Sequence, residues 1–218
     1  LLGSNGAGKS TLMNILSGLL EPSEGEVHVK GKLENIDSPS KAANLGIGMV
    51  HQHFMLVDAF TVTENIILGN EVTKGINLDL KTAKKKILEL SERYGLSVEP
   101  DALIRDISVG QQQRVEILKT LYRGADILIF DEPTAVLTPA EITELMQIMK
   151  NLIKEGKSII LITHKLEEII SIVDEVTVLR DGELIGSKLV DEHTTKEELT
   201  KMMVGRDVLF NFDKNKKA

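Results

Sequence analysis

One run of nine residues near the start of the chain has the types and spacing of a phosphate-binding loop. Residues 3–11 read Gly-Ser-Asn-Gly-Ala-Gly-Lys-Ser-Thr and fit the pattern G-x-x-x-x-G-K-[ST] at every fixed position. In such a loop, glycines let successive backbone N–H groups turn inward around an anion, and the following helix adds its own N-terminal N–H groups. A plain glycine turn would need neither the lysine nor the hydroxyl. The sequence therefore predicts nucleoside triphosphate contacts from Gly3, Ser4, Asn5, Gly6, Ala7, Gly8, Lys9, Ser10 and Thr11.

Two carboxylates at the end of an apolar run could supply hydrolytic chemistry. Residues 127–130 are apolar, and Asp131 and Glu132 follow them directly. Because ligands bind beyond the carboxyl ends of parallel strands, Asp131 is suited to hold Mg²⁺ through the water shell of the ion. Ser10 is the second expected Mg²⁺ ligand, and Lys9 is expected to reach the β- and γ-phosphates. Glu132 is suited to take a proton from attacking water, although two acids could also simply end a strand.

The composition argues against several other classes of function. The chain has 218 residues, of which 42% are hydrophobic and 27% charged, as in one globular domain or a domain with a subdomain. A formal net charge of −7 and an aromatic content of 3% make a nucleic-acid face or a base-stacking platform unexpected. No apolar run approaches the roughly 20 residues of a membrane-spanning helix. The absence of cysteine excludes disulfides and thiolate metal sites, which suits a reducing cytosol.

Apolar periodicity and capping residues predict an α/β fold with a mostly parallel sheet. Strands are expected at residues 46–50, 125–130 and 158–163, with a hairpin at 176–186. Helices are expected at 80–94, after Ser108, after a capping box of Thr138 and Glu141, and after Thr195. The helix after the phosphate loop is expected to end near Pro22 and Gly25 and to bury Leu12, Ile15, Leu16 and Leu19.

Residues 108–114 read Ser-Val-Gly-Gln-Gln-Gln-Arg, which resembles the Leu-Ser-Gly-Gly-Gln signature of ABC ATPases. In that family, the serine caps a helix whose N-terminus faces the γ-phosphate of an ATP held by the opposing subunit. Two chains therefore enclose each ATP. The resemblance implies nucleotide contacts from Ser108, Gly110 and Gln111.

Two further positions resemble the same family. Gln52 matches the loop glutamine that contacts Mg²⁺ and the attacking water and senses the transporter partner. His164 matches the switch histidine near the γ-phosphate, although a single histidine at a strand end is more often structural. The order of phosphate loop, glutamine, signature, acidic pair and histidine runs without a gap from Gly3 to His164.

The resemblance implies an ABC ATPase, a P-loop NTPase fold with small β elements beside its parallel sheet. We expect the ATPase core at residues 1–71 and 126–218, and a helical subdomain that carries the signature at 72–125. Val109 replaces the first signature glycine, and Thr138 stands where an aspartate is usual. Both departures are typical of the ABC ATPases that serve tandem sugar and nucleoside importers.

Residues 49–54, 133–139 and 203–207 resemble the first ATPase half of tandem bacterial importers for sugars and nucleosides. Such a protein hydrolyses ATP to drive solute uptake through transmembrane permease subunits. Its partners are a second ATPase half and, indirectly, an extracellular receptor lipoprotein. The resemblance implies a peripheral place on the cytoplasmic face of the membrane. We also expect this chain to be a fragment, because it opens almost inside the phosphate loop.

Three other classes of nucleotide-binding protein fit this sequence less well. ABC ATPases of DNA repair and chromosome maintenance carry long coiled-coil insertions, for which the stretch from Lys9 to Ser108 is too short. Ribosome-associated ABC ATPases are expected to carry a basic arm, which this acidic chain lacks. A regulatory module without turnover would not need Glu132.

The segment after Gln52 contains three apolar residues, Phe54, Met55 and Leu56. We expect these residues either to line a groove that receives the permease or to belong to the ordinary core.

Overall fold

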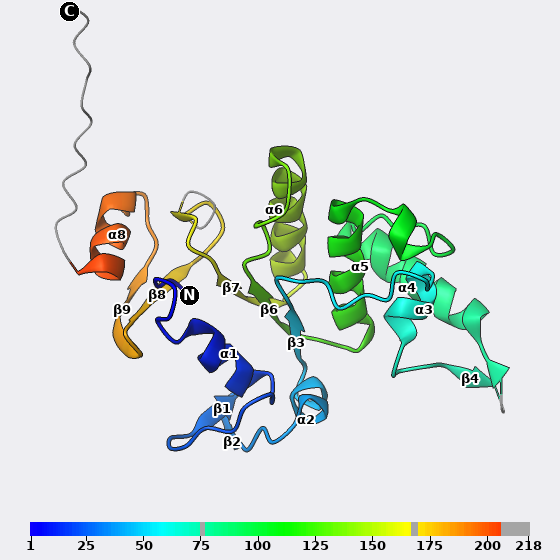
Figure 1. Ribbon diagram of the computed structural model, residues 1–218, viewed down its shortest axis with the longest axis horizontal. Coiled ribbons are helices and arrows are strands. Elements are labelled where there is room, and N and C mark those ends of the chain that lie inside the picture. Colours follow the sequence, from blue (N-terminus) through cyan, green and yellow to red (C-terminus); the bar gives the residue numbers. More distant parts are fainter. Residues whose placement is uncertain (75–76, 167–169, 206–218) are drawn as a thin grey trace, which may run out of the picture. The chain divides into compact units, whose positions relative to one another are not determined.

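The computed structural model describes residues 1–74, 77–166 and 170–205 (Figure 1). The chain divides into two compact units, one of Leu1–Lys9 with Thr163–Ala218 and one of Ser10–Ile162. The boundary falls inside helix α1 (Lys9–Leu16), so the phosphate loop and most of this helix belong to different units. In the described ranges, no helix is long and apolar enough to cross a bilayer.

The larger unit is built on a parallel sheet with β6 at its centre. The strand order is β3 (Ile47–Val50), β6 (Ile127–Asp131) and β7 (Ser158–Ile162). The side chains of Leu128 and Phe130, on one face of β6, and of Ile129, on the other face, are completely buried. Such burial is typical of a central strand that is covered on both faces. The α/β fold with a parallel sheet that the sequence predicts is confirmed.

Helices pack along both outer strands of this sheet. α5 (Val109–Tyr122) and α2 (Pro39–Asn44) contact β3, whereas α6 (Pro139–Lys154) contacts β7. α6 begins with the predicted capping box. The Thr138 hydroxyl accepts the Glu141 N–H at 3.4 Å, and the Glu141 carboxylate accepts the Thr138 N–H at 2.9 Å. These bonds satisfy N–H groups that the first helical turn would otherwise leave without partners.

Helices α3 (Val62–Ile67), α4 (Leu80–Tyr94) and α5 pack against one another and lie together in Figure 1. α4 buries Ala83, Ile87 and Tyr94 of the apolar face that its periodicity predicts, whereas Leu80 of the same face is 37% exposed at the start of the helix. The smaller elements of this unit are β1 (Val27–Val29), β2 (Lys32–Glu34), β4 (Thr73–Lys74), β5 (Asn77–Leu78) and a short 3₁₀ helix (Ile104–Asp106).

In its described residues, the smaller unit contains a hairpin on which a helix packs. β8 (Glu175–Arg180) pairs antiparallel with β9 (Glu183–Leu189), and α8 (Lys196–Val204) packs on both strands. The chain before the phosphate loop joins this hairpin. Leu2 donates its N–H to Thr177 O and accepts the N–H of Leu179, each at 2.8 Å. The buried core of the unit consists of Leu2, Val176, Val178 and Leu199.

The prediction for the helix after the phosphate loop is wrong in its length and its buried face. α1 ends at Leu16, because Gly18 adopts a left-handed φ of 73° just beyond it. Leu19 therefore lies outside the helix and is 57% exposed, and Leu12 is 39% exposed. The buried residues of α1 and its end are Met13, at 2% exposed, Lys9, at 7%, and Ser17, at 8%.

Candidate functional site

The phosphate loop has a tightly turned backbone in the smaller unit. Gly6 and Gly8 have φ angles of 81° and 95°, in the left-handed region that side chains rarely adopt. The Ala7 N–H donates to Ser4 O at 3.1 Å, and the Gly182 N–H in the turn of the β8–β9 hairpin donates to Ala7 O at 3.3 Å. The loop thus has the kind of turned backbone in which successive N–H groups can gather around an anion.

Lys9 folds back into this loop and is almost completely buried. Only 7% of its surface is exposed. Its ammonium donates to Gly3 O at 2.8 Å and to Ser4 O at 3.0 Å. Because an ammonium carries three donors, it can hold both carbonyls and still donate to a phosphate oxygen. Held in this way, Lys9 could stabilise the negative charge of a bound phosphate chain.

The next two residues of the motif, Ser10 and Thr11, lie in the first turn of α1 and are exposed. The first turn of a helix has N–H groups without intrahelical partners and carries a partial positive charge. Asn5, inside the loop, is also exposed. This part of the motif is therefore open to a ligand.

The parallel sheet of the larger unit brings Gln52 to the same edge as the two predicted carboxylates. Val50, the last residue of β3, is in register with Phe130 of β6. Gln52 follows Val50 by two residues, and Asp131 follows Phe130 directly. Both residues therefore lie at the carboxyl ends of neighbouring parallel strands, the edge at which α/β sheets bind ligands. Asp131 is half-buried and Gln52 is exposed.

The backbone of Glu132 is strained. Its φ is 47°, which is uncommon for a residue with a long side chain. The other described non-glycine residues with positive φ are Lys30 and Asp181, which lie in hairpin turns that favour such angles. The Glu132 N–H donates to Ile162 O of β7 at 2.9 Å, and its carbonyl accepts the Ala135 N–H at 3.2 Å. Strain that neighbouring contacts hold in place is concentrated at functional sites, so the backbone marks Glu132 independently of the sequence motif.

The oxygen groups of the predicted metal site suit Mg²⁺. The Asp131 carboxylate, the Gln52 amide oxygen and the Ser10 hydroxyl are all hard oxygen ligands. Within the described residues, no group of three or more His, Cys, Asp or Glu side chains could hold a metal ion. This donor set fits Mg²⁺, which keeps several waters and binds through one or two carboxylates together with substrate phosphates.

The signature helix α5 begins with a complete capping box. The Ser108 hydroxyl accepts the Gln111 N–H at 3.3 Å, and the Gln111 side chain accepts the Ser108 N–H at 2.9 Å. The Gly110 N–H donates to the Glu141 carboxylate of α6 at 3.0 Å. A Cβ on Gly110 would lie 2.5 Å from that carboxylate, so a larger residue here would displace the Glu141 side chain. Ser108 and Val109 are exposed at the start of the helix.

The sequence did not predict how this helix is anchored. Besides the bond from Gly110 to Glu141, Arg114 forms an ion pair with Glu144 of α6. The capping pattern identified Glu141 only as part of the start of α6. Nothing in the sequence indicated that the same carboxylate also reaches α5, because this contact depends on how the two helices pack.

The site residues are divided between the two units. His164 follows β7 by two residues and is exposed, and it belongs to the smaller unit with Lys9 and the phosphate loop. Ser10, the sheet edge and the signature helix belong to the larger unit. Within the larger unit, the sheet gathers Gln52, Asp131 and Glu132. Within the smaller unit, Lys9 lies inside its loop.

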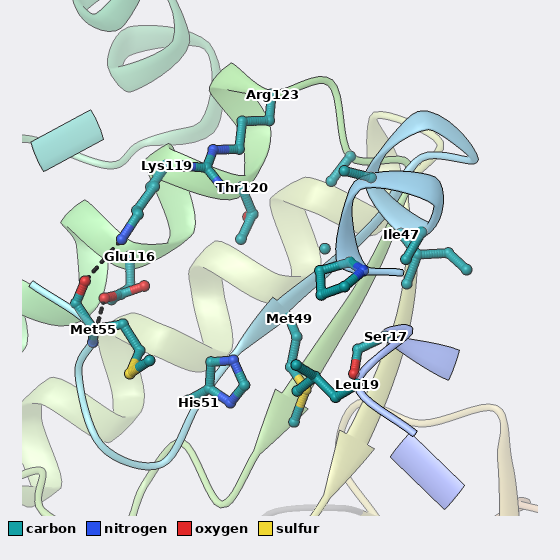
Figure 2. A pocket seen from close by; sticks show the side chains of 15 residues that line it. Ser17, Leu19, Ile47, Met49, His51, Met55, Glu116, Lys119, Thr120 and Arg123 are labelled. Atoms are coloured by element: carbon teal, nitrogen blue, oxygen red, sulfur yellow. Dashed lines mark hydrogen bonds between the residues drawn. The ribbon is translucent and has the colours of Figure 1, made fainter. Parts of the chain in front are cut away.

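A pocket of about 230 Å³ lies in the larger unit beside the segment that follows Gln52 (Figure 2). Met55 in this segment is 64% exposed and lines the pocket, so it does not belong to the core. Phe54 and Leu56 are half-buried. Of the three apolar residues in this segment, Met55 is the one most available to a partner.

Comparison with known proteins identifies the family. A family model described as ABC transporter matches residues 1–135. The chain belongs to this family. The signature, phosphate loop and acidic pair all lie within the matched residues, so the resemblance predicted from these motifs is confirmed.

Two relatives of this ABC transporter chain are import proteins by name. It is 86% identical over 214 residues to the nucleoside import ATP-binding protein NupA of Lactococcus lactis subsp. cremoris. It is 65% identical over 215 residues to the guanosine import ATP-binding protein NupO of Bacillus subtilis. Each match covers 98% of this chain and 42% of the relative. The chain therefore spans less than half the length of these curated relatives.

Solved ABC transporter structures share the fold. One is the dimeric, post-hydrolysis state of the ATP-binding cassette MJ0796 bound to ADP and Pi. It matches with a TM-score of 0.71 and 28% identity, covering 87% of this chain and 83% of that chain. The predicted ABC ATPase fold is confirmed by this likeness.

Proposed function

We propose that this chain binds ATP with Mg²⁺ and hydrolyses it to drive import of a nucleoside through a membrane permease. The observation that carries the proposal is the sheet edge where Gln52, Asp131 and the strained Glu132 lie at the ends of neighbouring strands. An amide, a metal-binding carboxylate and a carboxylate base are the groups that attack of water on a phosphate requires. Membership of the ABC transporter family supports the same roles.

Each site residue has a distinct role in this proposal. The phosphate loop and Lys9 hold the β- and γ-phosphates. Ser10, Asp131 and Gln52 would hold Mg²⁺, which when bound neutralises charge that develops on the phosphates. Glu132 accepts a proton from the attacking water, and His164 lies near the γ-phosphate. The loop residues that contact the nucleotide are Gly3, Ser4, Asn5, Gly6, Ala7, Gly8 and Thr11.

We also propose that a second ABC ATPase half completes the site. The capped start of α5 exposes Ser108 and is suited to meet a γ-phosphate held by another subunit. The proposed contacts are Ser108, the half-buried Gln111 and Gly110, which is buried with its N–H bound to Glu141 and would need that bond to open. The dimeric form of the similar cassette MJ0796 supports this arrangement. In the same proposal, residues 1–71 and 126–218 form the ATPase core, and residues 72–125 form the helical subdomain that carries the signature.

The proposed partners follow from the import relatives. A permease segment would dock at the pocket beside Met55, which places the protein peripherally on the cytoplasmic face of the membrane. An extracellular receptor lipoprotein would deliver the solute without touching this chain. The two relatives named for nucleoside or guanosine import favour a nucleoside over the alternative, a sugar. Their names also favour import over DNA repair or ribosome binding.

Removal of Mg²⁺ is expected to abolish ATP turnover, because the proposed ligands are oxygen groups that bind the ion only together with the phosphates. The measurement is phosphate release by the full-length protein that contains this chain, with ATP and either Mg²⁺, Mn²⁺ or excess EDTA. We expect activity with Mg²⁺, activity with Mn²⁺ and none with EDTA. Full activity in excess EDTA would remove the metal from the proposal.

A further inference from the structure

The segment after Gln52 is held by side chains of the signature helix α5. The Met55 N–H donates to the Glu116 carboxylate at 2.7 Å, and the Lys119 ammonium donates to Met55 O at 2.8 Å. Figure 2 shows both side chains reaching from α5 to the backbone of Met55 at the edge of the pocket. Both polar groups of one residue are thus bound by a charged pair on one helix.

The environment of this pair makes the contact strong. Glu116 is 3% exposed. Burial lowers the pKa of the Lys119 ammonium. The negative charge of Glu116 opposes this shift, and the positive charge of Arg123 adds to it. Hydrogen bonds to charged groups are stronger than those between neutral groups, and removal of one partner leaves a buried group without compensation. Met55 is therefore fixed by its backbone while its side chain stays exposed.

A second contact of the same kind follows two residues later. The Asn65 side chain of α3 accepts the Val57 N–H at 2.7 Å and donates to Val57 O at 3.1 Å. Asn65 is completely buried, and α3 packs against α5. The chain from Met55 to Val57 is therefore held by side chains of two packed helices, α3 and the signature helix α5.

The chain between the sheet and this contact is short. Gln52 lies two residues after the end of β3 and three residues before Met55. Three residues span at most about 10 Å, so the position of Met55 limits where Gln52 can lie. Glu116 stands eight residues after Ser108 on the same helix, or about 12 Å along its axis. A movement of the signature helix would therefore be carried directly to the Gln52 segment.

We propose that Glu116 and Lys119 are positioning residues that hold Met55 and thereby set Gln52 for ATP hydrolysis. Neither residue is among the predicted nucleotide or metal ligands, so each would act through Gln52. This inference rests on the proposed function, because it assigns Gln52 a place in turnover. It adds a physical connection between the signature helix and the sheet edge, made by two side chains on a backbone rather than by side-chain packing.

The test is a double-mutant cycle in the full-length protein assembled with its membrane subunits. Gln52→Ala, Glu116→Ala and the double variant are compared by kcat and by KM for ATP. We expect each single variant to lower kcat by about 10-fold with little change in KM, since one charged hydrogen bond is worth about that factor. If Glu116 acts through Gln52, the double variant will be no slower than Gln52→Ala alone.

Three further variants separate positioning from folding. Glu116→Gln keeps an oxygen acceptor for the Met55 N–H and should retain kcat within about twofold and keep that amide protected from hydrogen exchange. Lys119→Met, at a half-buried position, should lower kcat even if Glu116→Ala does not fold. Thr143→Val is the control, because Thr143 lies on α6, outside the pocket, and donates within its own helix, to Pro139 O at 3.0 Å. It should leave kcat unchanged.

The inference is overturned if Glu116→Ala and Lys119→Met keep the parental kcat, or if the effects of Gln52→Ala and Glu116→Ala multiply in the double variant. Each of these results can arise in an assembly that hydrolyses ATP, so the proposed function would survive them. A parental assembly without ATPase activity would remove both the proposed function and this inference.

Discussion

Replacement of Glu132 with glutamine is expected to lower ATP turnover at this site by about 10²-fold or more and to leave ATP binding nearly intact. Glutamine has the same shape and can still hydrogen-bond, but it cannot accept the proton of the attacking water. Glutamine has the same Cβ as glutamate, so the strain at the φ of 47° is the same in both proteins. The measurement is single-turnover hydrolysis together with ATP affinity in the full-length protein.

A matched control is Glu155→Gln. Glu155 is a carboxylate at the end of α6, where it pairs with Arg93 on the surface. Its replacement should leave ATP turnover unchanged. That result would show that the loss of turnover in Glu132→Gln comes from that particular carboxylate and not from the loss of any one negative charge. Hydrolysis at the parental rate by Glu132→Gln would show that another group is the base.

Loss of the Lys9 ammonium is expected to weaken ATP binding itself, by roughly 10²-fold, since it removes a charged donor to the phosphates. Lys9 is also 7% exposed and holds Gly3 O and Ser4 O. Lys9→Ala would therefore leave a cavity and loosen the loop. Lys9→Met is the sharper variant, because it fills the space of the lysine stem without its charge.

Equilibrium binding of ATP to both variants separates the two effects. We expect both to bind weakly, and Lys9→Met to keep a thermal stability closer to that of the parental protein. Near-parental affinity in Lys9→Met would show that the loop backbone, and not the ammonium, holds the phosphates.

Several features of this site could be predicted because they depend on neighbouring residues. The capping boxes at Ser108 and Thr138 are formed within three residues, and the sequence contains both partners of each. The parallel sheet then places the ends of its strands at one edge, so Gln52 and Asp131 could be expected together there once the strands were identified.

Other features could not be predicted, because they depend on packing between distant segments. Periodicity alone assigned Leu12 to the buried face of α1, whereas the structure exposes it and buries Met13. The hydrogen bonds that fix the Met55 backbone have no counterpart in the sequence pattern. Glu116 and Lys119 bind its backbone, which every residue type offers, across 61 and 64 positions of the chain.

The most direct test of the account measures hydrolysis and transport together. The full-length protein and its permease would be placed in proteoliposomes with ATP and Mg²⁺ on the side of this chain and a labelled nucleoside with its receptor on the other. The account predicts that nucleoside accumulation and phosphate release rise together and that Glu132→Gln suppresses both. Nucleoside accumulation that continues without ATP, or phosphate release that Glu132→Gln does not change, would contradict it.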